Sequence, residues 1–122
     1  MHIVITRPKE DSLYLIENLI KSGHMVTHLP VIKIEKLKKK KINLLNYQAL
    51  IFTSSNAIKF MNIEKFNSKI KCFCVGKITE IAAKNIGFVN TYASEGTVDS
   101  LIELIIRTID NKSEKLLYLS SE

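Results

Sequence analysis

The stretch Tyr47–Ala57, YQALIFTSSNA, decides the fold. The four residues Ala49–Phe52 form a short apolar run between polar neighbours, which predicts a strand buried on both faces. Thr53–Asn56 follow directly, and a helical pattern begins near Ala57; Ser, Thr and Asn are residues that cap helix starts. The stretch therefore predicts a strand, a tight polar turn and a helix N-terminus.

Such a turn has two interpretations. It lies at the carboxyl end of a strand, where open α/β sheets bind ligands, and its backbone N–H groups suit an anion. However, every strand–helix unit needs a polar turn, and most of these turns bind nothing. The pattern of residues 53–56 alone leaves both interpretations open.

Composition narrows the class of protein. The 122 residues, 46 % of them hydrophobic, suffice for a folded core. No apolar stretch reaches membrane-spanning length and the start lacks the layout of a signal peptide, so we predict a cytoplasmic protein with no membrane partner. The net charge of +6 suggests an acidic partner, which could be nucleic acid, a membrane surface or an anionic small molecule.

Five lysines in Lys36–Lys41 contribute much of this charge. No aromatic residues interleave with them as a stacking platform, so a solvated connector is favoured over nucleic-acid binding. Cys72 and Cys74 alternate in a predicted strand and point to one face, which favours core packing over a disulfide or a zinc site.

Strands and helices alternate along the rest of the chain. Gly23 and Gly87 each end a helical pattern as C-terminal caps, and Pro30 interrupts the extended segment Met25–Ile34. Residues 63–69 are predicted to be irregular. The expected strands are Ile3–Ile5, 25–34, Ala49–Phe52, Cys72–Val75, Val89–Ala93 and Leu116–Leu119, with helices near 10–22, 57–62, 78–86 and 98–109. This order predicts an α/β fold with a mainly parallel, flavodoxin-like sheet.

Familiar catalytic motifs are missing from the sequence. There is no Gly-rich phosphate loop, no nucleophile elbow, and no clustering of His2, His24 or His28 with metal ligands. Ser54 and Ser55 have no base nearby in sequence.

Polar turns after the strands are the remaining feature. In one parallel sheet these turns would line one edge and hold several carboxylates, largely through backbone N–H groups. The turns are Thr6-Arg7, Thr53–Asn56, Gly76–Thr79, Ser94–Thr97 and Ser120-Ser121.

Several motifs carry a family resemblance. VITRP at 4–8, SGHMVTHLPVIKIE at 22–35, ALIFTSSNAIKF at 49–60 and CVGKITEIAAKNIGF at 74–88 occur in order, followed by ASEGTVDSLIELI at 93–105 and KLLYLSSE at 115–122. Together they resemble the uroporphyrinogen-III synthase family, whose third and fourth segments read F-T-S-x-N-A-V and A-V-G-x-x-T-A-x-x-L-x-x-x-G-F.

The resemblance implies an enzyme that cyclises hydroxymethylbilane to uroporphyrinogen III with inversion of the last pyrrole ring, without a metal or organic cofactor. It implies two α/β lobes around a cleft: residues 1–33 as the first strand–helix–strand piece of lobe one, 34–41 as a Lys-rich connector and 42–122 as most of lobe two. The predicted substrate-binding residues are Thr6, Arg7, Thr53, Ser54, Ser55, Asn56, Gly76, Thr79 and Gly96.

Two departures from the family pattern matter. Ser120 and Ser121 stand where the family usually has an arginine and a glycine, and the family continues past this point to a tyrosine favoured as proton donor. The resemblance thus predicts a shortened chain that is inactive alone, leaves its catalytic residue unassigned, and self-associates through unpaired strands. The alternative is a non-catalytic, flavodoxin-like or receiver-like anion-binding module, although Thr6-Arg7 stands where a receiver has acidic residues.

Overall fold

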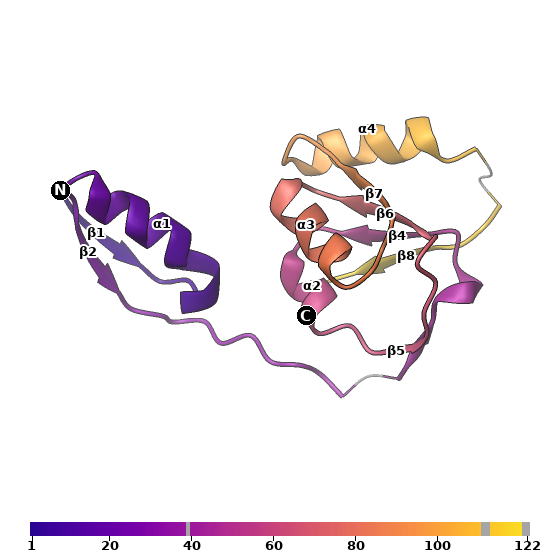
Figure 1. Cartoon of the computed structure of the whole chain (residues 1–122), viewed down its shortest axis with the longest axis horizontal. Coiled ribbons are helices and arrows are strands. Elements are labelled where there is room, and N and C mark those ends of the chain that lie inside the picture. Colours follow the sequence, from indigo (N-terminus) through magenta and orange to yellow (C-terminus); the bar gives the residue numbers. More distant parts are fainter. Residues whose placement is uncertain (39, 111–112, 121–122) are drawn as a thin grey trace. The chain divides into compact units, whose positions relative to one another are not determined.

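The computed structural model describes residues 1–38, 40–110 and 113–120. The chain divides into two compact units, Met1–Lys36 and Leu37–Glu122 (Figure 1). The division falls inside the lysine-rich segment predicted as a connector, and the lysines of that segment that the structure describes are exposed. Each unit is described by itself below.

The first unit is a strand–helix–strand motif. Strand β1 (His2–Ile5) pairs in parallel with β2 (Met25–His28), and helix α1 (Lys9–Lys21) connects them. Pairing continues past β2, because Leu29 N donates to Ile5 O and Val31 N to Thr6 O. Pro30 falls between these two donors, where its missing N–H costs no hydrogen bond. The sequence predicted an interruption at Pro30, and the regular strand β2 ends before it, at His28.

Helix α1 ends as its sequence predicts. Gly23 has φ +81°, a conformation that glycine adopts without the strain of a Cβ, and its N–H donates to Ile20 O. Gly87, with φ +108°, occupies the same position after the third helix. At the start of α1, Pro8 is the N-cap, and Glu10 and Asp11 lie in the first turn, where negative charge is favourable.

The second unit contains a four-stranded parallel sheet in the order β7-β6-β4-β8 (Figure 1). Its strands are β4 (Ala49–Phe52), β6 (Lys71–Cys74), β7 (Asn90–Ala93) and β8 (Leu116–Leu119). Its helices are α2 (Ser55–Lys59), α3 (Lys77–Asn85) and α4 (Val98–Thr108), with the short 3-10 helix η1 (Leu44–Asn46) before β4. The parallel α/β fold predicted from the sequence is confirmed.

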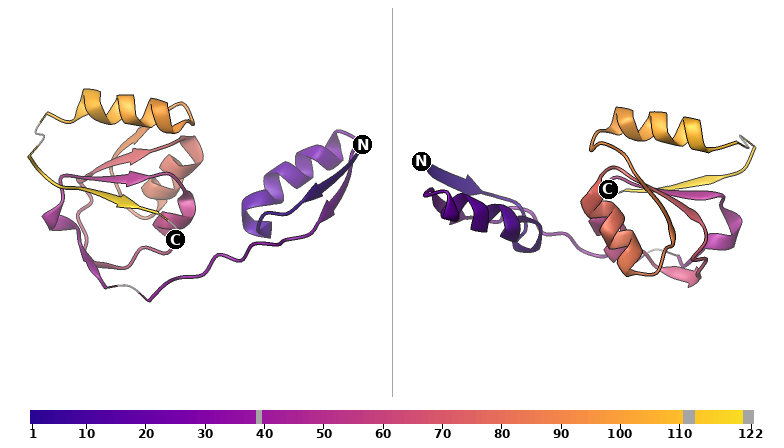
Figure 2. Two further views of the ribbon diagram at one scale, coloured as in Figure 1. Left: turned by 180° about the vertical axis from the view of Figure 1, so that it is seen from behind. Right: turned by 45° about the horizontal axis from the view of Figure 1, so that its top comes forward.

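Alternation along the strands produces two cores, one on each face of the sheet. Leu50, Phe52, Cys72 and Cys74 pack on one face with residues of α2 and α3. Ala49, Ile51 and Phe73 lie on the other face with Leu101 of α4. Figure 2 shows α4 on one side of the sheet and α2 and α3 on the other. The run Ala49–Phe52 is apolar at every position because both faces of β4 are covered.

Both cysteines are free thiols in the core, on the same face, as their spacing predicts. Burial raises the pKa of Cys72 to about 12, with a further contribution from Cys74. Burial and the nearby Glu80 likewise raise the pKa of Cys74 to about 12. Neither thiol is available as a thiolate near neutral pH.

The prediction that residues 63–69 are irregular is wrong in part. Strand β5 (Ile63–Lys65) pairs in parallel with β3 (Ile42–Asn43), and Ile42 N donates to Asn62 O just before it. The polar sequence IEK has little strand character of its own. It is extended because β3, some twenty residues earlier in the chain, supplies its hydrogen-bond partner.

Within the described residues, no helix combines the length and the apolar character needed to cross a bilayer.

Candidate functional site

The carboxyl edge of the four-stranded sheet gathers three of the predicted polar turns. These turns follow β4, β6 and β7 at residues 53–54, 75–76 and 94–97. Because all four strands are parallel, their carboxyl ends meet at one edge. Ser120 follows β8 at the same edge, while Ser121 lies outside the described residues.

Two of these turns are in contact. A Cβ added to Gly76 would lie 3.7 Å from the Cα of Gly96, so the backbones after β6 and β7 approach closely. Ser94 fixes this approach, because its N–H donates to Cys74 O over 2.9 Å and its hydroxyl donates to Val75 O over 2.8 Å. The sequence predicted that Gly76 and Gly96 belong to one binding site; the structure places the two glycines near each other, and their role in binding stays a prediction.

The first turn of α3 presents backbone N–H groups at this contact. Gly76 is the N-cap of α3, and no side chain caps the helix. In contrast, Thr97 caps α4 by a capping box with Ser100, in which Ser100 N donates to Thr97 Oγ1. Of these two helix starts, α3 is the one without a side-chain cap, so its first N–H groups are left to water or a ligand.

A buried carboxylate lies one turn into α3. Glu80 is only 6 % exposed and accepts hydrogen bonds from Lys77 Nζ at 2.6 Å, Lys84 Nζ at 3.0 Å and Thr91 Oγ1 at 3.0 Å. These bonds, that of Lys77 foremost, lower the pKa of Glu80 to about 2. Glu80 is a fixed anion near neutral pH, and it holds the Lys77 ammonium beside the start of α3.

In the turn after β4, the Ser54 side chain hydrogen-bonds to the start of the helix that follows. Ser54 is the N-cap of α2, and its hydroxyl accepts from Asn56 N over 3.2 Å. Ser55 is already the first residue of the helix, so α2 begins two residues earlier than the sequence predicted. The predicted binding roles of Ser54, Ser55 and Asn56 remain predictions.

Thr53 has a partner that the sequence did not suggest. Its Oγ1 lies 3.2 Å from the Oη of Tyr118 in β8, 65 residues later. Register explains the pair: Tyr118 lies beside Ile51, and Thr53 is the next residue after Ile51 on the same face. Tyr118 was predicted only as part of the last strand. The one feature of the sequence that could have indicated this pair is that Tyr118, an aromatic residue with a terminal hydroxyl, stands between two leucines.

Thr79, one of the predicted substrate-binding residues, is buried in the second unit. It lies at the third position of α3 and is 5 % exposed, so its hydroxyl is not on an open surface of this unit. Its predicted role in holding the ligand stays a prediction.

Thr6 and Arg7 do not share the edge described above, so the expectation of a single edge is wrong. They follow β1, which pairs only with β2 among the described residues and belongs to a separate sheet in the first unit. His28, at the end of β2, makes a 2.8 Å hydrogen bond from Nε2 to the carbonyl oxygen of Arg7. The two residues therefore lie at the carboxyl edge of their own sheet.

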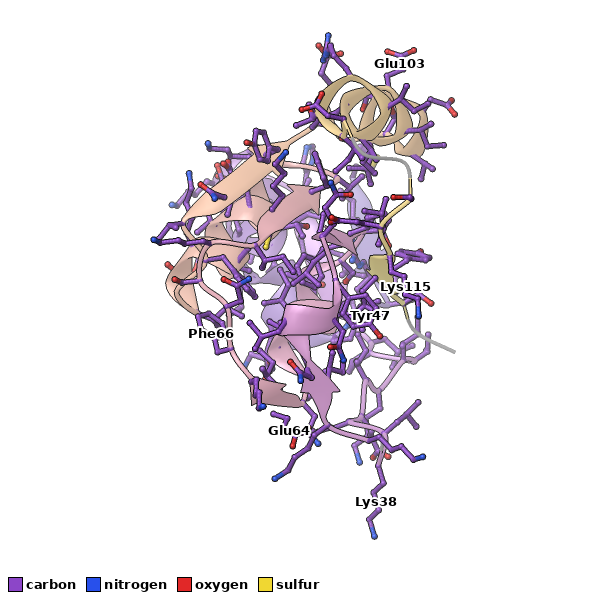
Figure 3. The ribbon with its side chains drawn as sticks, turned by 90° about the vertical axis from the view of Figure 1, so that its right-hand side faces the viewer. Lys38, Tyr47, Glu64, Phe66, Glu103 and Lys115 are labelled. Carbon is purple, nitrogen blue, oxygen red and sulfur yellow. The ribbon has the colours of Figure 1, made fainter. Side chains whose placement is uncertain are left out.

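The opposite, amino edge of the larger sheet carries a depression of about 590 Å³. Tyr47 and Lys115, labelled in Figure 3, are two of its lining residues, and Gln48 N donates to Lys115 O beside them. Gln48 Oε1 is buried there without a hydrogen-bond partner in the described part of the chain. No residue predicted to bind a ligand lines this depression.

Metal-binding clusters are absent from the part of the chain that the structure describes: no three His, Cys, Asp or Glu side chains there could hold an ion together. The carboxyl edge also carries exposed acidic residues, Glu95 and Asp99, near the Gly96 turn. These carboxylates make the electrostatic potential at the Gly96 turn more negative than it is beside Lys77.

Comparison with known proteins adds one match. A family model described as "Uroporphyrinogen-III synthase HemD" matches residues 14–122, which is most of the chain. The resemblance found from the sequence motifs is confirmed by this match. No curated protein matches the chain.

Proposed function

Because the chain belongs to the uroporphyrinogen-III synthase family, we propose that the carboxyl edge of its four-stranded sheet binds hydroxymethylbilane and takes part in closing it to uroporphyrinogen III. The substrate carries many carboxylates. The observation that supports this site best is the contact of the Gly76 and Gly96 turns beside the uncapped start of α3. Free N–H groups at a helix start and a net charge of +6 both favour a polyanion.

The proposed reaction begins when the hydroxymethyl oxygen takes up a proton and leaves as water, which gives an azafulvene cation; one proton is released again when the ring closure is complete. Attack by the substituted carbon of the last ring then gives a spiro intermediate, whose rearrangement inverts that ring. The protein's contribution is to bring the two ends of a flexible molecule together, and such orientation can supply about 7–11 kcal/mol.

The residues at the edge fit an orienting role. Backbone N–H groups of residues 77–79 would hold one side-chain carboxylate of the substrate, and Lys77, whose side chain is 72 % exposed, would attract a second. Glu80, with a pKa of about 2, cannot exchange a proton near neutral pH and serves to hold Lys77 and α3. Thr53, Ser54, Ser55, Asn56, Thr79 and Gly96 remain proposed binding residues around this centre, and Thr6 and Arg7 are proposed for the first unit.

Amide NMR during titration with uroporphyrin III, a stable oxidised form of the product, tests the site. We expect shifts at residues 76–79 and 94–97, and little change at residues 45–48 and 113–115 around the amino-edge depression. Shifts confined to the amino edge, or none, would contradict the proposal. A product assay that separates uroporphyrinogen III from the spontaneously formed type I isomer tests the chemistry separately. Binding without type III product above the enzyme-free blank would favour the non-catalytic binding module.

A further inference from the structure

The hydroxyl groups of Thr53 and Tyr118 form a pair at the corner of the sheet where β4 and β8 end. The two oxygens are 3.2 Å apart, and either can be the donor. In the described part of the chain, each is the hydrogen-bond partner of the other. Thr53 is partly buried, whereas Tyr118 is 55 % exposed. The pair is therefore anchored on one side and open to solvent on the other.

The proton count of this pair shows that it can donate a hydrogen bond to a ligand. Two hydroxyls carry two protons, and one of them is used in the bond between the two oxygens. Whichever oxygen donates, the other keeps an O–H that points out of the pair. The pair therefore offers an outward donor, and an anionic oxygen is the acceptor that gains most from it.

The position of the pair is set by the sheet rather than by a flexible loop. Tyr118 lies in register with Ile51 of the central strand β4, so its ring extends along the sheet face toward Thr53. The neighbouring residues Leu117 and Leu119 point to the opposite face and pack on the core there. The backbone of β8 is thus held on both sides of Tyr118, and the hydroxyl position follows from it.

We propose that the Thr53–Tyr118 pair is a further carboxylate-binding point, which extends the ligand site from the α3 start across β4 to β8. This inference rests on the proposed function, because it assigns the pair to the same polycarboxylate ligand. In this arrangement the Thr53 hydroxyl donates to the Tyr118 oxygen, and Tyr118 donates its own proton to a side-chain carboxylate of the ligand, so Thr53 is the positioning residue. The ring of Tyr118, left exposed on the sheet face, adds apolar contact with a pyrrole ring of the ligand.

The experiment is a fluorescence titration of the full 122-residue chain with uroporphyrin III at fixed salt. Tyr118→Phe keeps the ring and removes only the hydroxyl, and it should weaken binding about fivefold to tenfold. Tyr47→Phe makes the same chemical change at the amino edge, so it should leave the affinity within about twofold of the wild type. Near-equal affinities of wild type and Tyr118→Phe, with clear binding by both, would overturn this inference and leave the proposed function standing.

A double-mutant cycle separates the role of Thr53. Thr53→Val removes the hydroxyl and leaves the Ser54 cap of α2 intact. If Thr53 orients Tyr118, the Tyr118→Phe change should cost less affinity in the Thr53→Val background than alone. Additive effects would contradict the orienting role of Thr53. No binding by the wild type would overturn the proposed function and, with it, this inference.

Discussion

Thr91 Oγ1 donates a 3.0 Å hydrogen bond to Oε1 of Glu80, and this bond joins the edge strand β7 to helix α3. The same carboxylate binds Lys77 and Lys84, one on either side of it along the helix. Glu80 therefore fixes α3 relative to the sheet. The start of α3, where Gly76 meets Gly96, depends on this orientation.

Replacement of this carboxylate should destabilise the second unit. Glu80→Gln keeps the shape but removes the charge that Lys77 and Lys84 bind, and we expect a loss of about 1–3 kcal/mol in the free energy of unfolding. Urea denaturation measures it. Glu103→Gln is the matched control, because Glu103 is exposed on α4 and points away from the sheet (Figure 3). Equal stabilities of the two variants would show that the buried network contributes nothing.

Acid should weaken the protein through the same residue. The pKa of Glu80 is lowered from 4.5 to about 2, so its contribution is complete above pH 4.5 and is lost as the pH falls from 4.5 toward 2. We expect about 1–2 kcal/mol from this group, since Lys77 and Lys84 are exposed and water screens them. Unfolding free energies at pH 6, 4 and 3 would reveal it. A Glu80→Gln variant with an unchanged pH profile would refute this assignment.

The two glycines of the carboxyl edge should respond differently to alanine. Gly76 has an extended backbone with φ −164°, and a Cβ there makes only ordinary contact with Gly96, so Gly76→Ala should stay within about 0.5 kcal/mol of wild type. Gly96 has φ +97°, where a Cβ is strained, and Gly96→Ala should cost about 1–2 kcal/mol. Thermal unfolding distinguishes them, and a larger loss for Gly76→Ala would contradict the geometry.

For uroporphyrin III binding we expect the opposite order, in which Gly76→Ala lowers the affinity more than Gly96→Ala does. The added methyl group of Gly76→Ala lies between the two turns, next to the first N–H groups of α3, and should weaken binding. Undiminished affinity of Gly76→Ala would place the ligand elsewhere.

The small sheet of the first unit should promote self-association. Val4 and Met25 lie on one face of the β1–β2 pair, 54 % and 66 % exposed. We expect a concentration-dependent increase in sedimentation coefficient that Val4→Lys with Met25→Lys reduces, because lysines on an open sheet disfavour association. Tyr14→Lys, a change at a still more exposed position on α1, is the control. Association that persists in the double variant would exclude this face as the contact.

Local sequence determined most of the elements. The apolar run Ala49–Phe52 predicted the central strand, because a residue run without polar positions needs cover on both faces. Gly23 and Gly87 predicted two helix ends, because their positive φ angles follow from the absence of a Cβ. The alternation of Cys72 and Cys74 predicted their common face and their burial.

Long-range pairing decided what the sequence could not. The segment Ile63–Lys65 is a strand only because β3 pairs with it. Thr6 and Arg7 do not lie at the edge predicted for all the polar turns, because β1 and β2 form a sheet of their own. Tyr118 reaches Thr53 only through the register of β8 on β4. Residue type and spacing govern local dihedral angles and burial, whereas strand order and register depend on contacts between residues far apart in the chain, and those contacts place the candidate site.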